Sequence, residues 1–211
     1  MAIEIVEENE IVDPNLKELY MNSFPAVERR PIEKLNEMVK NDEKYHLYLV
    51  KEDNLTIGFA LVCELPDEKV SLLDYMVIND SFQRRGIGSK LLQYCIKVMK
   101  SKNSFLGLLL EIQLEDVNDS DERKMRKDRI RFYKKFGAKT FENVEYYIPP
   151  QSGNIAEKLH LMIIPFNKLD SFPKKSVENF VKKMHLEIYH SKRMDLIEKT
   201  VQSLSDTIKL I

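Results

Sequence analysis

Short apolar segments separated by polar turns occupy residues 45–78, in the pattern of antiparallel strands. Residues 45–50 and 56–63 are apolar runs joined by a turn at 52–55, and a second turn at 66–69 leads into the run 70–78. Connections this short join antiparallel neighbours, because a parallel pair needs a crossover of a dozen or more residues. The pattern predicts a three-stranded meander, and residues 3–6 predict one further short strand.

Helical spacing of apolar residues predicts four helices before residue 140. Asp13 followed by Pro14 has the form of an N-cap with proline at the first helical position, and Pro31 opens a second helix in the same way. Apolar positions at 91–99 predict a third helix after the last strand of the meander. A fourth is expected over 121–136, where Gly137 provides the usual end of a helix.

The second half of the chain predicts three more strands. Residues 108–115 alternate between an apolar and a mixed face, residues 139–148 form a strand with a bulge, and residues 159–166 form the last strand. The expected fold is α/β of the α+β type, with a mixed, mostly antiparallel sheet flanked by helices. Residues 1–166 are expected to form this domain.

Residues 167–211 predict a C-terminal helical extension. Apolar side chains recur in two helical stripes, one around Val177, Phe180 and Val181 and one around Leu196 and Ile197. Apolar stripes must be buried, so the extension is expected to pack on the domain or on a partner subunit in a homodimer. A coiled coil is less favoured, because the spacing drifts from a heptad repeat.

Composition excludes several classes of protein. The 211 residues include 33 basic and 34 acidic side chains, a net charge of −1, and 43% apolar residues. The charges nearly cancel, so the composition lacks the global basic field that would indicate a nucleic-acid partner. No apolar run reaches the ~20 residues that a membrane helix needs. The acidic N-terminus lacks the apolar core of a signal peptide. Cys63 and Cys95 lie in apolar segments, which indicates reduced core thiols and a cytoplasmic protein.

A glycine-punctuated turn links the strand 70–78 to the third helix. It reads Gln83-Arg84-Arg85-Gly86-Ile87-Gly88-Ser89-Lys90. The first N–H groups of a helix have no partner within it, and the summed peptide dipoles add partial positive charge there. Two glycines allow a ligand to approach the backbone, and two arginines add full charges. The turn therefore predicts a site for a phosphate or pyrophosphate.

Two common phosphate motifs do not fit this turn, because the third glycine of GxGxxG is missing and GxxxxGK[ST] is absent. Residues 83–88 instead resemble the Gln/Arg-x-x-Gly-x-Gly/Ala motif of the GNAT acyltransferase superfamily. Residues 74–80 resemble that family's fourth strand, and residues 131–138 resemble its later Phe-Tyr-x-x-x-Gly signature. The resemblance covers about residues 2–166. The alternative is an ordinary glycine-rich turn between a strand and a helix.

The resemblance implies a GNAT-like sheet of six to seven strands and acetyl-CoA as the co-substrate. It implies that the turn 83–90 and the backbone near Val77 bind the coenzyme, and that the thioester points at a splay between strands 70–78 and 106–115. It also implies that Tyr133 protonates the leaving thiolate. Asp74 and Glu111 are candidates for the base, and each is alternatively a surface or salt-bridge residue. His46 is a further candidate, with a structural role as its alternative. No metal-ligand spacing occurs, so no metal is expected.

An amine must be neutral when it attacks a thioester, and an alkylamine has a pKa of ~10.4, so a base or a water chain must take its proton. The resemblance therefore implies an acetyl-CoA-dependent N-acetyltransferase that acts directly on a primary amine of a small molecule or peptide. One alternative is a non-catalytic acyl-CoA-binding or regulatory protein of the same fold. Another is an acyltransferase that uses a longer acyl chain. The acceptor pocket is expected from residues 13–45 and 116–121, where no motif identifies the amine.

Overall fold

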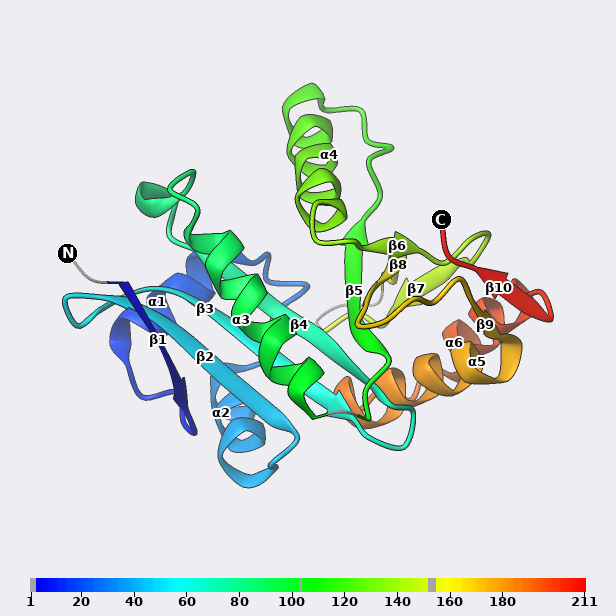
Figure 1. Cartoon of the computed structure of the whole chain (residues 1–211), viewed down its shortest axis with the longest axis horizontal. Helices are drawn as coiled ribbons and strands as arrows, with labels where there is room; N and C mark the ends of the chain where they lie inside the picture. The colour runs from blue at the N-terminus through cyan, green and yellow to red at the C-terminus, as the bar shows by residue number, and fades with distance from the viewer. Residues whose placement is uncertain (1–2, 103, 152–154) are drawn as a thin grey trace. The chain divides into compact units, whose positions relative to one another are not determined.

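The computed structural model describes residues 3–102, 104–151 and 155–211, and its elements are shown in Figure 1. The chain divides into two compact units. Unit 1 comprises Met1–Glu64, Ser71–Asn103 and Gln151–Gly153, and unit 2 comprises Leu65–Val70, Ser104–Pro150 and Asn154–Ile211. Both units combine strands with helices, and the strand pairs within each are antiparallel. The fold class predicted from the sequence is confirmed.

Unit 1 carries four strands in the order β1-β2-β3-β4 and three helices. The strands are β1 (Ile3–Glu8), β2 (Tyr45–Glu52), β3 (Leu55–Leu65) and β4 (Val70–Ile78). The helices are α1 (Pro14–Ser23), α2 (Ile32–Asn41) and α3 (Ile87–Ser101). Asp13 caps α1 as expected, because its side chain accepts the N–H of Asn15 at 2.8 Å.

The two faces of β2 and β3 pack against different helices. Tyr48 on β2 makes an edge contact with Tyr94 of α3, with ring centroids 5.2 Å apart. Side chains alternate along a strand, so the neighbouring positions Leu49 and Phe59, which are cross-strand partners, lie on the other face. There Phe59 contacts Tyr20 of α1, with ring centroids 6.3 Å apart. Unit 1 is therefore a sheet buried on both sides.

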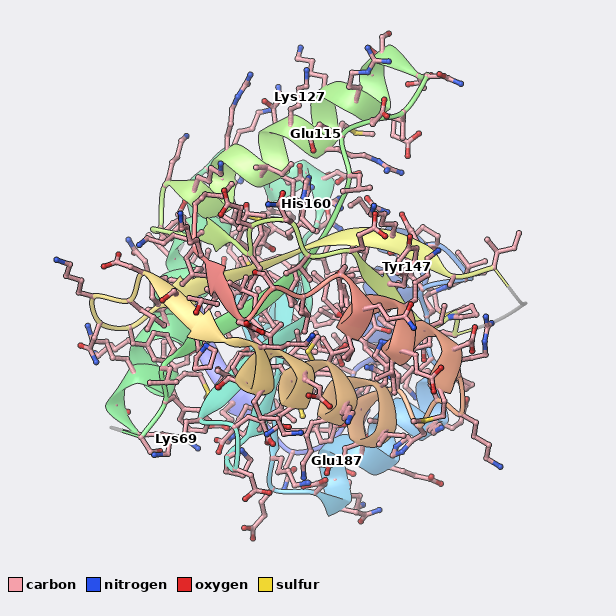
Figure 2. All side chains as sticks on the ribbon, turned by 90° about the vertical axis from the view of Figure 1, so that its right-hand side faces the viewer. Lys69, Glu115, Lys127, Tyr147, His160 and Glu187 are labelled. Carbon is pink, nitrogen blue, oxygen red and sulfur yellow. The ribbon has the colours of Figure 1, made fainter. Side chains whose placement is uncertain are left out.

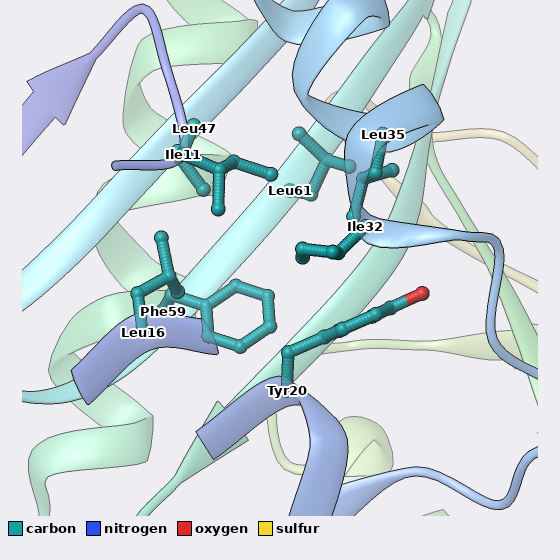
Figure 3. A pocket seen from close by; sticks show the side chains of 8 residues that line it. All are labelled: Ile11, Leu16, Tyr20, Ile32, Leu35, Leu47, Phe59 and Leu61. Atoms are coloured by element: carbon teal, nitrogen blue, oxygen red, sulfur yellow. The ribbon is translucent and has the colours of Figure 1, made fainter. Parts of the chain in front are cut away.

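A small apolar gap remains beneath α1 and α2 (Figure 3). Its volume is about 10 Å³. It is lined by Ile11, Leu16, Tyr20, Ile32, Leu35, Leu47, Phe59 and Leu61. A space of this size is at the lower limit for one water molecule, and its apolar walls offer water no hydrogen bonds. It is a packing gap and not a pocket for an acceptor substrate.

In unit 2, β8 is the central strand. It pairs with β5 along one edge and with β6 and β7 along the other. The elements are β5 (Gly107–Gln113), α4 (Ser120–Lys134), β6 (Lys139–Thr140), β7 (Tyr146–Ile148) and β8 (Glu157–Pro165). The single bulged strand expected over 139–148 is thus interrupted. Asn143 has a φ of +59° at the interruption, a left-handed conformation that asparagine tolerates in turns.

The extension folds within unit 2. It consists of β9 (Ser171–Pro173), α5 (Lys174–Lys183), a π-helical turn (Met184–Ile188), α6 (Met194–Gln202) and β10 (Thr207–Lys209). The helices follow the predicted stripes, and the pairing of β9 with β10 is a feature that the sequence did not indicate. Phe172 stacks on Phe141, with centroids 5.5 Å apart, and meets Phe180 edge-on. These rings anchor the extension beside β6, and the domain boundary at residue 166 stays a prediction.

Both cysteines are buried and free, as the composition suggested. Burial raises the pKa of the thiols of Cys63 and Cys95 to about 12, and thiols that stay protonated at neutral pH are unreactive. Among the described residues, no helix combines the length and the apolar character needed to cross a membrane.

His185, in the π-helical turn, yields a test of how the extension is docked. Its Nε2 donates a hydrogen bond to the carbonyl oxygen of Tyr147 at 3.0 Å, and burial lowers the pKa of the imidazole from 6.5 to about 4. Between these values the unfolded chain binds a proton that the folded chain does not. The free energy of unfolding should therefore fall by about 2 kcal/mol between pH 7 and pH 5 through this group alone.

His185→Gln keeps an N–H donor but does not titrate. Chemical denaturation at pH 7 and pH 5 gives the free energy of unfolding of both proteins. The value for wild type minus the value for the variant should be smaller at pH 5 than at pH 7 by about 2 kcal/mol. Parallel pH dependence in the two proteins would contradict a buried neutral imidazole at this position.

Candidate functional site

The turn after β4 is held by its own side chains. Asn79 caps a short 3₁₀ turn, Asp80–Phe82, by accepting the N–H of Ser81 at 3.0 Å. The amide nitrogen of Gln83 donates to the carbonyl oxygen of Ile78 at 3.0 Å and to the carboxylate of Asp80 at 2.6 Å. The first residue of the predicted motif therefore fixes the turn to the end of the strand.

Gly86 starts α3 from a left-handed conformation. Its φ is +78°, and it has no side chain to cap the helix. The first helical bond runs from the N–H of Lys90 to the carbonyl oxygen of Gly86, at 3.1 Å. The N–H groups of Ile87, Gly88 and Ser89 precede that bond and point out of the helix end. The sequence predicted these donors, and the left-handed glycine explains how the chain presents them.

Positive charge surrounds this helix end. Arg84, Arg85 and Lys90 are exposed. Arg85 folds back onto the turn, where its guanidinium donates to the carbonyl oxygen of Ser81 at 2.9 Å and lies 5.0 Å from the centre of the Phe82 ring. Together with the helix dipole, these groups form an electropositive surface suited to a pyrophosphate.

The end of β4 beside the turn is closely packed. A Cβ atom on Gly58 of β3 would lie 2.8 Å from the carbonyl oxygen of Val77 and 2.4 Å from the Ile78 side chain. Only glycine allows this approach. Val77 itself is half-buried, and its predicted role is backbone contact with the coenzyme.

Asp74 forms a buried ion pair with Arg30. The guanidinium donates to both carboxylate oxygens at 2.7 and 2.8 Å, and the two side chains are 3% and 2% exposed. Burial raises the pKa of Asp74, and the charge of Arg30 opposes that shift. Arg30 therefore lies buried, although it belongs to the loop between α1 and α2.

Two tyrosine hydroxyls fix the same loop between α1 and α2. Tyr75 donates to the carbonyl oxygen of Glu28 at 2.8 Å, and Tyr20 donates to that of Arg30 at 3.0 Å. The two rings meet edge-on with centroids 5.2 Å apart. This loop, assigned to the acceptor side by the resemblance, is thus rigidly connected to β4.

Tyr133 lies in the last turn of α4 and is 8% exposed. Its ring packs against Phe132, with centroids 5.1 Å apart, and its carbonyl oxygen accepts the N–H groups of Phe136 and Ala138. Gly137 has a φ of +83°, so the helix ends where the sequence placed a glycine stop. Both the packing role and the catalytic role are compatible with this position.

Glu111 lies on β5 and is half-buried. Its carboxylate accepts hydrogen bonds from two tyrosine hydroxyls, one from Tyr146 on β7 and one from Tyr189 in the extension. The sequence singled out the carboxylate but neither tyrosine. Their positions follow from pairing between distant segments, for which a single sequence carries no signal.

His46 lies between two carboxylates. Its ring nitrogens contact Glu7 at 2.7 Å and Glu64 at 2.5 Å, and Lys102 also pairs with Glu64. This network ties β1, β2 and β3 to the end of α3, which favours the structural reading of His46 over the reading as a base.

The sequence did not indicate a second contact between a histidine and a carboxylate. His160 on β8 contacts the carboxylate of Glu115 at 2.7 Å (Figure 2), and this hydrogen bond lowers the pKa of Glu115. Glu115 lies just after β5 and is 41% exposed in its side chain. Among the described residues, no group of histidine, cysteine and carboxylate side chains could hold a metal ion.

The arginines of α4 mainly fasten the segment between β5 and α4. Arg126 donates to the carbonyl oxygen of Leu114 at 2.8 Å, and Arg123 donates to that of Val117 at 2.9 Å. Arg129 contacts the side chain of Gln113 at 3.0 Å. These contacts leave fewer of the basic side chains for a coenzyme than their number suggests.

Solved structures share this fold. One, described as an acetyltransferase from the GNAT family of Bacteroides thetaiotaomicron, aligns with a TM-score of 0.69 and 24% identity over 91% of this chain and 100% of that one. Residues 1–166 make up less than four fifths of the 211 residues, so the alignment includes part of the extension.

Two further structures align over shorter parts of this chain. The ribosomal-protein-S18-alanine N-acetyltransferase from Escherichia coli has a TM-score of 0.59 and 18% identity over 80% of this chain and 96% of its own. A GNAT family acetyltransferase from Elizabethkingia anophelis with acetyl-CoA bound has a TM-score of 0.50 and 19% identity over 76% and 95%.

No curated protein matches the chain. A model of the Acetyltransferase (GNAT) family matches residues 14–138, more than half of the chain, and this span includes α1, the turn 83–90, β5 and Tyr133. The chain belongs to the GNAT family of acetyltransferases.

Proposed function

We propose that this protein transfers an acetyl group from acetyl-CoA directly to a primary amine of a small molecule or a peptide. The observation that carries the proposal is the start of α3, where left-handed Gly86 presents three backbone donors beside exposed basic side chains. The structure from Elizabethkingia anophelis contains acetyl-CoA, and the enzyme from Escherichia coli is named for an alanine acceptor in a protein. The first supports acetyl-CoA as the donor, and the second supports an amine as the acceptor.

In this proposal the pyrophosphate of the coenzyme binds at residues 86–89, and the backbone at Val77 directs the thioester to the reaction site. Anchoring one end of a long substrate places the reacting carbonyl, and near-attack placement lowers a barrier by ~7–11 kcal/mol. The amine nitrogen forms a bond to the acetyl carbon while the carbon–sulfur bond breaks. The amine proton passes to a base or water, and the thiolate receives a proton.

Tyr133 is the proposed donor of that proton. A phenol has a pKa of ~10 and a thiol of ~8.5, so the transfer is uphill by a little over one unit and depends mainly on position. The phenolate then regains a proton from water. The low exposure of Tyr133 supports a fixed position for the hydroxyl.

Glu111 is the stronger of the two proposed carboxylates on the acceptor side. The side chain of Asp74 is 3% exposed and is paired bidentately with Arg30, so taking a proton there would break the ion pair. Glu111 accepts hydrogen bonds from two tyrosine hydroxyls, which orient its carboxylate. The alternative to the proposed transferase is a binding protein without turnover. Only a transferase releases free thiol when an amine is added to the protein with acetyl-CoA.

Replacement of Gly88 by aspartate tests the anchor. The new carboxylate would lie where a phosphate is expected, beside the backbone donors, and like charges repel. Coenzyme A affinity in calorimetry should drop at least about tenfold, which is ~1.4 kcal/mol. Gln93→Asp adds the same side chain to the exposed face of α3 away from its start and should bind normally. Equal binding by both folded variants would reject the site.

Replacement of Tyr133 by phenylalanine tests the proton donor. The ring and its packing remain, and only the hydroxyl is lost. Acid catalysis contributes ~10²–10⁴-fold, so kcat should fall by that order while KM for acetyl-CoA changes little. Tyr94→Phe, on α3, is the matched control. A change in kcat below threefold would assign Tyr133 to packing, with water as the proton donor.

Replacing one or both residues of the Asp74–Arg30 pair tests whether the Asp74 carboxylate has a structural or a catalytic role. Arg30→Met leaves a buried charge and should lower the free energy of unfolding by ~3–5 kcal/mol, whereas Arg30→Met combined with Asp74→Leu should recover most of that loss. Denaturant unfolding measures both. If the double variant is stable and retains turnover, Asp74 is not the base, and a stable but inactive double variant would restore it as the candidate.

A further inference from the structure

The Glu111 cluster in unit 2 joins three segments that are distant in sequence. Glu111 on β5 pairs across the sheet with Leu161 of β8, and Tyr146 on β7 pairs with Leu159 of the same strand. Positions two apart on a strand lie on one face, so Glu111 and Tyr146 project from the same face of the sheet. The hydroxyl of Tyr146 donates to one carboxylate oxygen of Glu111, and that of Tyr189 donates to the other.

The backbone of the extension is shaped to place Tyr189 there. The N–H of Tyr189 bonds to the carbonyl oxygen of Met184, five residues earlier, at 3.0 Å. This π-helical turn replaces the α-helical repeat at the end of α5, and such turns occur frequently at functional sites. His190 follows with a φ of +48°, so the helical path ends directly after the tyrosine.

A second contact locks this turn to β7. His185, which is completely buried, donates its Nε2 hydrogen to the carbonyl oxygen of Tyr147 at 3.0 Å. The His185 ring also meets the rings of Tyr146 and Tyr189 edge-on, with centroids 6.1 and 6.4 Å apart. The two hydroxyls on Glu111 therefore belong to one packed group.

Burial is uneven across the cluster. Tyr146 is 0% and Tyr189 is 8% exposed, while Glu111 is half-buried. A contact that served stability alone would be as well or better provided by apolar side chains, because a desolvated charge costs free energy. A carboxylate that buried donors fix, on a residue that is itself only partly buried, is instead suited to contact a ligand.

We propose that Tyr189 is a positioning residue for acetyl transfer, which acts through the Glu111 carboxylate. Tyr189 and Tyr146 hold the Glu111 carboxylate in one orientation toward the amine. The inference rests on the proposed function, since Glu111 acts there on the amine. It adds that residues 167–211 contribute to turnover and not only to stability.

The experiment compares Tyr189→Phe with Tyr147→Phe. Tyr147 lies beside Tyr146 on β7 and stacks under Lys199, so its loss of a hydroxyl is a matched control. The probes are acetyl-CoA with spermidine, with lysine amide and with a tetrapeptide amide that has a free N-terminal alanine. Wild-type enzyme should acetylate at least one of them, and that amine is used for the variants.

For Tyr189→Phe, kcat/KM for the amine should fall at least about tenfold, because a carboxylate that loses one of its two hydroxyl donors is no longer fixed and a small misplacement of a reacting group can lower a rate by about 10²-fold. KM for acetyl-CoA should be unchanged. Hydrogen bonds to a carboxylate favour its ionised form, so the acidic limb of the pH profile should move to higher pH. In a Glu111→Gln background the same substitution should have no further effect. A loss below twofold, equal losses in Tyr147→Phe, or additive losses with Glu111→Gln would overturn the proposal.

Failure of the proposed function is distinguishable from failure of this inference. If wild-type protein binds coenzyme A in calorimetry but acetylates none of the probes, the assigned transfer to these amines fails, and with it the role of Tyr189 in turnover. The coupling itself is then measured by carbon-13 NMR of the Glu111 carboxyl group, assigned with Glu111→Gln. A titration midpoint that moves in Tyr189→Phe but not in Tyr147→Phe supports positioning, and one that moves in neither rejects it.

Discussion

The left-handed turn at Gly86 is the constraint on which the site depends. It lets the chain leave β4 and enter α3 with the first helical N–H groups of Ile87, Gly88 and Ser89 pointing outward. A residue with a Cβ at this φ is strained by roughly 1 kcal/mol or more. The helix behind the turn is buried through Leu91, Leu92 and other apolar positions, so the donors are held by a rigid element and not by a flexible loop.

Burial of charge has a different purpose in each of the two carboxylates that the sequence proposed. Asp74 is neutralised by Arg30, and this pair joins the α1–α2 loop to β4. An ion pair of this kind fixes a geometry more than it adds stability. Glu111 accepts hydrogen bonds from two tyrosine hydroxyls, which are neutral donors that orient a carboxylate. The same residue type therefore joins two elements at one strand and is oriented by hydroxyl groups at the other.

Local signals predicted those parts of the fold that depend on local physics. The bounds of β4, the Asp13 cap of α1 and the glycine end of α4 follow from side-chain spacing, capping and backbone preference. The interruption between β6 and β7 and the β9–β10 pair follow from contacts between distant segments. The turn with its backbone donors at the start of α3 could be predicted because it is continuous in sequence. The partners of Asp74 and Glu111 could not, since Arg30 is 44 and Tyr189 78 residues away.

The proposed roles of the turn and of the extension differ in what they require of the chain. The turn before α3 needs only a continuous stretch of chain, so its backbone donors do not depend on how distant segments pair. Binding residues lie disproportionately on loops and added segments that a rigid scaffold positions. The π-helical turn that carries Tyr189 replaces regular helical hydrogen bonding with an irregular one. Such a departure from the regular helix persists when the surrounding contacts hold it, and here His185 and Glu111 provide them. Specificity for the amine would then depend on the part of the chain that the family's motifs do not cover.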